Sequence, residues 1–154
     1  MKRYTWLWKA TDILTMQAML NRIKSYNNAS LPEEQFTGIH FDIEPYTLRA
    51  SQGDPADWAT QSSQIISEWM LNVNKYTKFI AQSIQVPVSC TLHFSMDDKP
   101  TGDPTYPYVD EFMIGKHDKV AITAYRDFAL GVDSITYHAQ AEIDSAEAQK
   151  KPNC

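Results

Sequence analysis

The chain has 154 residues, of which 43% are hydrophobic and 21% charged, and this composition suits a soluble protein with one buried core. Its net charge is −5 and it has no basic cluster, so we expect neither nucleic acid nor an anionic membrane as a partner. No apolar run approaches the roughly 20 residues of a membrane span. The N-terminus lacks a signal-peptide core, so we expect no export of the chain as written, and its compartment stays open.

The two cysteines predict free thiols rather than a disulfide framework. Cys90 lies in an apolar run, which indicates a buried thiol, and Cys154 is the last residue. No Cys-x-x-Cys spacing indicates a metal or redox centre. We therefore expect no cofactor.

The first half of the chain alternates between strand and helix patterns. Residues 4–8 are short and aromatic-rich, which is typical of a strand. Residues 13–23 carry apolar side chains at helical spacing, and residues 38–43 alternate as a strand does. A polar stretch over residues 51–63 leads to the clearest element, a helix with one apolar face over residues 65–80.

The second half repeats this order. Residues 86–94 predict a strand, residues 96–107 a loop rich in Asp, Pro and Gly, and residues 108–114 a short helix. Residues 120–125 predict another strand. A last helix, capped by Asp133 or Ser134, is marked by four apolar residues, which are Ile135, Ala139, Ile143 and Ala146.

Strands that alternate with helices predict an α/β fold built from parallel βαβ units. We expect a single domain over residues 1–154, folded as a partial TIM-type (β/α) barrel of about four strand–helix units. A complete barrel takes about 250 residues. Half a barrel would expose sheet edges, so we expect either a homo-oligomer or a part of a longer chain.

The segment FTGIHFDIEP, residues 36–45, is the predicted active-site strand. Because side chains alternate across a strand, His40, Asp42 and Glu44 share one face. Glu44 precedes the proline that ends the strand, which puts it at the carboxyl-terminal rim where barrel enzymes carry their chemistry. Two acids on one face disfavour joint ionisation, which can create the general acid that glycoside hydrolysis needs.

This segment resembles the fourth-strand motif DGxDxDxE of glycoside hydrolase family 18, the chitinase-like (β/α)8 barrels. Gly38, Asp42 and Glu44 match, while Thr37 and His40 stand where the family has acids. The resemblance implies that Glu44 is the general acid and that Asp42 orients the N-acetyl group of the substrate, which acts as nucleophile. The His40 departure implies a different proton network around Asp42.

A weaker resemblance involves the family's sixth-strand motif MxYD, which supplies a tyrosine near the reacting sugar. In the segment TAYR, Tyr125 matches and Arg126 replaces the acid. This implies a catalytic role for Tyr125. In the implied register, residues 4–8 form the third barrel strand, and the chain spans strands three to six.

Three further residues are candidates for binding a carbohydrate at the rim. Trp8 ends the first strand and can offer an aromatic face to a sugar. His93 ends the strand of residues 86–94, and Arg126 follows Tyr125. Three hypotheses remain open: a glycosidase-like carbohydrate-binding or carbohydrate-hydrolysing barrel, a non-catalytic half-barrel that self-associates, and a metal-dependent hydrolase using His40, Asp42, Glu44 and His93.

Overall fold

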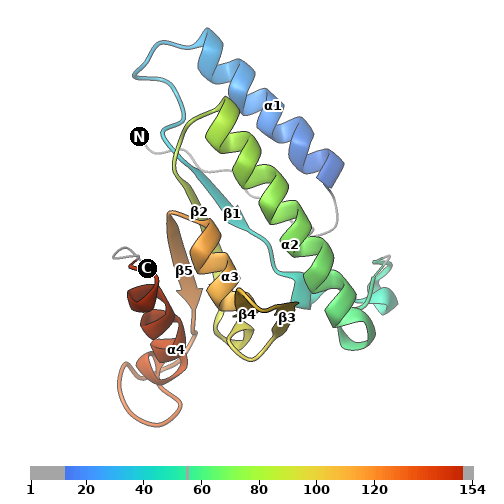
Figure 1. Ribbon diagram of the computed structural model, residues 1–154, viewed down its shortest axis with the longest axis vertical. Helices are drawn as coiled ribbons and strands as arrows, with labels where there is room; N and C mark the ends of the chain where they lie inside the picture. Colours follow the sequence, from blue (N-terminus) through green and yellow to red (C-terminus); the bar gives the residue numbers. More distant parts are fainter. Residues whose placement is uncertain (1–12, 55, 151–154) are drawn as a thin grey trace.

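The computed structural model describes residues 13–54 and 56–150 of the chain (Figure 1). The predicted strand over residues 4–8 and Cys154 lie outside these ranges. The described elements, in chain order, are α1 Ile13–Ala29, β1 Ile39–Asp42, η1 Pro45–Thr47, η2 Ala50–Gln52, α2 Trp58–Ser83, β2 Val88–His93, η3 Phe94–Met96, β3 Pro100–Asp103, β4 Tyr106–Tyr108, α3 Val109–Lys116, β5 Lys119–Thr123 and α4 Ile135–Ala148.

The centre of the fold is a parallel sheet in the order β1-β2-β5. In its register, His40 on β1 pairs with Ser89 on β2, and Asp42 pairs with Thr91. Between β2 and β5, Thr91 pairs with Ala121. The α/β class and the parallel pairing are therefore confirmed for the described residues. This sheet is open, and no closed barrel is seen.

One face of the sheet forms the core. Ile39, Phe41 and Ile43 are buried on β1 and just after it, as the alternation predicts. They belong to one apolar cluster with buried residues of all four described α-helices. In Figure 1, α2 lies in front of β1 and α3 in front of β2. The opposite face carries the polar side chains, which are only half-buried.

The helices α1 and α2 follow the predicted apolar faces. Met16, Leu20 and Ile23 are buried on α1. Trp69 and Tyr76 are buried on α2, which is longer than predicted because Asp57 caps it by accepting a hydrogen bond from the Ala59 amide.

The predicted loop over residues 96–107 is wrong in part, because it contains an antiparallel pair of short strands, β3 and β4. Gly102 has a φ of 78°, a conformation that glycine adopts without strain. The Asp103 carboxylate accepts a hydrogen bond from the Thr105 amide at 2.8 Å and closes the turn. These local contacts form a hairpin in a segment whose composition indicates only a turn.

The last helix begins where predicted but buries only part of the predicted face. The Ser134 hydroxyl caps α4 by accepting a hydrogen bond from the Tyr137 amide at 3.1 Å. Ile135 and Ile143 are exposed, whereas Ala139, Glu142 and Ala146 are buried. The predicted face of this helix is therefore confirmed at Ala139 and Ala146 and wrong at Ile135 and Ile143.

Candidate functional site

The predicted polar face of β1 is present. His40 and Asp42 lie on β1, and Glu44 follows two residues after its last residue, all three half-buried. Pro45 begins the short helix η1, so Glu44 sits at the turn that ends the strand. The acids therefore lie at the carboxyl-terminal end of a parallel strand, where enzymes with parallel sheets place their reactive groups.

His40 is held by the neighbouring strand. Its Nδ1 lies 2.9 Å from the Ser89 hydroxyl, and its Nε2 lies 2.9 Å from the Thr91 hydroxyl. Burial lowers the pKa of His40, and the charge of Asp42 offsets this only in part. Because a neutral imidazole donates from one nitrogen and accepts at the other, the two hydroxyls complete its hydrogen bonding. His40 therefore acts as a strand-to-strand bridge beside the acids.

Asp42 is the carboxyl group whose environment favours a bound proton. One of its oxygens, Oδ1, is buried without a hydrogen-bond partner. Burial and the nearby charge of Glu44 raise the pKa of Asp42, while His40 and a hydrogen bond from Thr91 lower it. A carboxyl group whose pKa is raised by burial beside a second acid is a common feature of enzyme sites that transfer protons.

Glu44 is fixed by a tyrosine that the sequence analysis did not select. The Tyr46 hydroxyl donates a hydrogen bond to Glu44 Oε1 at 2.7 Å. The Tyr46 ring lies 4.8 Å from the His93 ring. Burial, followed by this hydrogen bond and nearby negative charge, raises the pKa of Tyr46, so its hydroxyl stays a donor. In the sequence, the feature that could have identified Tyr46 as a site residue is its position two residues after Glu44.

His93 lies at the end of β2 beside this pair, as expected for a rim residue. Its Nδ1 accepts a hydrogen bond from the Ser95 amide at 3.2 Å. Its ring stacks on Phe94 at 4.4 Å. Burial lowers the pKa of His93, the charge of Glu44 raises it, and Arg126 lowers it further. His93 therefore belongs to the same strand-end group as Glu44.

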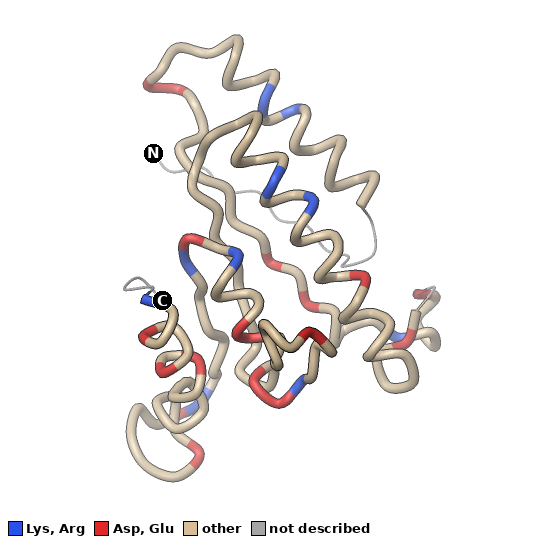
Figure 2. The backbone as a smooth tube through the Cα atoms, in the orientation of Figure 1, with Lys and Arg blue, Asp and Glu red and all other residues tan. Residues whose placement is uncertain are grey.

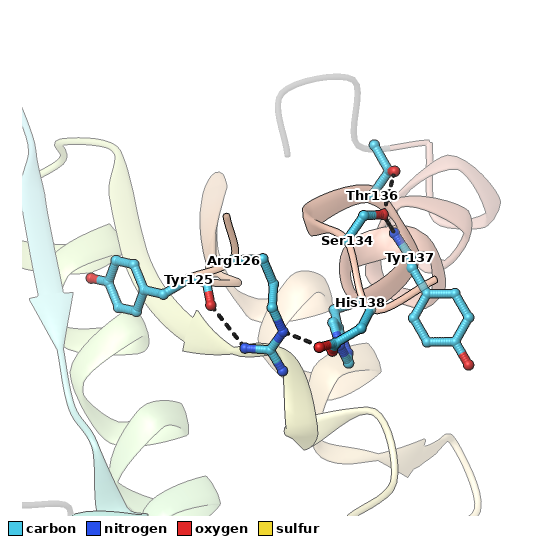
Figure 3. Close-up of polar contacts among 7 residues, drawn as sticks. Tyr125, Arg126, Ser134, Thr136, Tyr137 and His138 are labelled. Atoms are coloured by element: carbon cyan, nitrogen blue, oxygen red, sulfur yellow. Dashed lines mark hydrogen bonds and ion pairs between the residues drawn. The ribbon is translucent and has the colours of Figure 1, made fainter. Parts of the chain in front are cut away.

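Tyr125 and Arg126 follow β5, which ends at Thr123, two residues earlier than predicted. The Tyr125 side chain is exposed, with the residue 85% accessible to solvent. Arg126 is paired with Asp133: its Nε donates to that carboxylate at 2.9 Å, and its guanidinium lies 4.9 Å from the Phe94 ring. Figure 3 shows the Tyr125 ring and the Arg126 guanidinium pointing in different directions. Trp8 lies outside the described residues.

The metal-site hypothesis gains no geometric support. Within residues 13–54 and 56–150, no group of three His, Cys, Asp or Glu side chains is arranged to hold a metal ion. One physical reason is that both ring nitrogens of His40, one of which would have to bind the metal, contact the hydroxyls of Ser89 and Thr91 instead.

A groove of about 500 Å³ lies away from the acids, at the amino-terminal end of β2. Its lining includes Lys78 and Lys116, together with Val88, the first residue of β2. The groove is open to solvent and lies at the opposite end of the strands from Glu44.

Comparison with known proteins gave no match to a family model, a curated protein or a solved structure. Among the described helices, none is long and apolar enough to cross a membrane. Because no known protein matches, the function of the chain has to be inferred from the geometry at the strand ends.

Proposed function

We propose that the chain carries a carbohydrate site at the carboxyl ends of its parallel strands, with Glu44 as the acid that meets the glycosidic oxygen. The single observation that carries this proposal is the pair of half-buried acids, Asp42 and Glu44, on one face at the end of β1. The resemblance of residues 36–45 to the chitinase-like barrels supports an N-acetylated sugar as the ligand.

In this proposal, each strand-end residue has one task. Tyr46 holds one oxygen of Glu44, which leaves the other oxygen for the ligand. Asp42, whose pKa is raised by burial, lies beside Glu44 and orients the N-acetyl group of the sugar, as the resemblance implies. The exposed ring of Tyr125 and the half-buried ring of His93 offer surfaces on which a pyranose can pack.

Titration with tetra-N-acetylchitotetraose, followed by NMR, tests this proposal. We expect the amide shifts to change at the strand ends, in residues Asp42, Glu44, Tyr46, His93 and Tyr125. A cellotetraose titration is the control, because it lacks the acetamido group and separates N-acetyl recognition from general sugar binding. Unchanged shifts at millimolar sugar, or changes confined to the groove beside Lys78 and Lys116, would contradict the proposal.

A second candidate function, a half-barrel that pairs with another copy, is favoured by the sheet itself. Parallel sheets are ordinarily covered on both faces. Here only one face meets the apolar core, and no described strand pairs with the outer edge of β1 or of β5. Association of two copies would cover the polar face and complete the strand-end site from both sides.

We therefore expect light scattering at micromolar concentration to give about twice the chain mass of 17.6 kDa. The dimer should dissociate on dilution if the contact is polar and modest in area. A mass of one chain at every concentration would contradict this expectation, without bearing on sugar binding by the monomer.

A further inference from the structure

A buried carboxyl group lies between α4 and the rest of the protein, far along the sequence from the strand-end acids. Glu142 is 1% exposed, and both of its carboxyl oxygens lack a hydrogen-bond partner. It sits on α4 between Ala139 and Ala146, which are also buried. An ionised carboxylate in such a place would be strongly unfavourable, because burial removes its hydration.

The helix α3 brings a second buried acid to the same region. Asp110 is 4% exposed, and its Oδ1 also lacks a partner. The two helices approach closely at Gly115, where an added Cβ would lie 2.9 Å from the Gln149 side-chain oxygen. Gln149 Nε2 in turn donates to the Glu111 carbonyl at 3.0 Å. Figure 2 shows acidic segments, in red, on the tubes of both helices.

The charges that face this contact are negative. Asp97, at the end of η3, and Asp110 both act on Glu142, and Glu111 acts with Asp97 on Asp110. Lys99 acts on Asp97 but is 2.6 Å from Asp98, with which it is paired. Burial therefore favours the neutral form of Glu142, and its acidic neighbours favour it further.

We propose that the α3–α4 contact is a proton-dependent latch, in which the buried carboxyl group of Glu142 must be protonated for α4 to stay docked and the buried carboxyl group of Asp110 adds to the effect. Asp110 lies in the first turn of α3, where the helix dipole tolerates a negative charge. Glu142 has no such compensation, so it is the group whose ionisation releases α4. The proposal is independent of any sugar binding at the strand ends.

The direction of the pH effect follows from the two protonation equilibria. Burial, reinforced by Asp97 and Asp110, raises the pKa of Glu142 from 4.5 to about 7, and burial raises that of Asp110 from 3.8 to about 6. Because the pKa of each acid is higher in the folded state than in the unfolded state, docking of α4 is fully stabilised at a pH below the unfolded-state pKa. This stabilisation is lost as the pH rises to the folded-state pKa, so α4 should loosen between about pH 5 and pH 7.

Release of α4 would also disturb the segment that carries Tyr125. The His138 ring on α4 lies 4.4 Å from the Phe94 ring, and its Nε2 lies 2.5 Å from Asp133. Asp133 also accepts the hydrogen bond from Arg126, which Figure 3 shows beside the amino-terminal turn of α4. The latch therefore controls the order of the β5–α4 loop, with Tyr125 at its start.

Hydrogen exchange of the α4 amides at pH 5.5 and pH 8.0, corrected for the intrinsic exchange rate, tests the latch. In the parent chain, we expect α4 protection relative to α2 to fall by about 10- to 100-fold over this interval. Glu142→Gln keeps the shape of the neutral acid and should abolish the fall. Glu147→Gln removes the same charge from an exposed position of α4 and is the matched control, which should behave as the parent does.

Asp110→Asn provides a second variant, which should reduce the pH-dependent fall in α4 protection without abolishing it. A carboxyl ¹³C titration should place the midpoint of Glu142 near pH 7. The latch would be refuted by a Glu142 midpoint near 4.5, or by a Glu142→Gln chain that keeps the parental fall. Equal loss of protection in α2 and α4 would refute it as well, because that result means global rather than local unfolding.

Discussion

Replacing Phe41 by alanine is expected to lower the free energy of unfolding by about 3–5 kcal/mol. Phe41 is 0% exposed on the core face of β1, and its ring stacks on Tyr76 of α2 with 4.0 Å between centroids. Alanine would remove the ring from the contact between sheet and helix and leave a cavity there. Urea denaturation followed by circular dichroism measures the change.

Two further substitutions make this result specific to the core face. Phe128→Ala is the matched control, since Phe128 is 69% exposed, and its cost should stay within about 0.5 kcal/mol. Phe41→Leu keeps most of the volume and should cost about 1 kcal/mol, which allows a measurement if the alanine variant does not fold. Equal costs for Phe41→Ala and Phe128→Ala would mean that β1 has another register, with its acids facing the core.

The alternation in residues 36–45 was the most informative pattern in the sequence. It predicted which side chains of β1 are buried, because a strand packed on one side enforces a period of two. The apolar spacing of residues 65–80 predicted α2 for the same kind of reason, with a period near 3.6. Both patterns are local, so one sequence is enough to detect them.

The features that the sequence did not predict depend on contacts between distant segments. His40 bonds to Ser89 and Thr91, which are about 50 positions away. The His138 ring on α4 lies 4.4 Å from the Phe94 ring of η3, which comes much earlier in the chain. Side-chain partners of this kind follow from the packing of β1 on β2 and of α4 on η3, which no local pattern encodes.

The face of α4 differs from the one that residue hydrophobicity indicates. Ile135 and Ile143 indicated an apolar face that is in fact exposed, while Glu142 is buried. The buried positions of α4 on either side of Glu142 are alanines, Ala139 and Ala146, whose small side chains need less room than isoleucine in a helix contact.

Replacing the strand-end acid Glu44 is expected to have the second large effect, a loss of turnover. If the chain hydrolyses 4-methylumbelliferyl diacetylchitobioside, Glu44→Gln should lower kcat by about 100-fold or more, since it removes the proton donor. Gln keeps the size of Glu and can still accept the Tyr46 hydrogen bond, so binding of tetra-N-acetylchitotetraose should change little. A loss in kcat with nearly constant affinity is the result that distinguishes a catalytic acid from a binding residue.

Glu33→Gln is the matched control for this experiment. Glu33 is exposed in the loop before β1, and its replacement makes the same change in charge without touching the strand ends. Equal turnover by the Glu44→Gln and parent chains would remove Glu44 from the catalytic role. Binding without turnover in the parent would instead assign the strand ends to recognition alone. That outcome would fit the proposed resemblance to the chitinase-like motif, because Thr37 and His40 stand where the motif has acids. The physical reason would then be the imidazole of His40, which bridges two hydroxyls where the motif has a carboxylate.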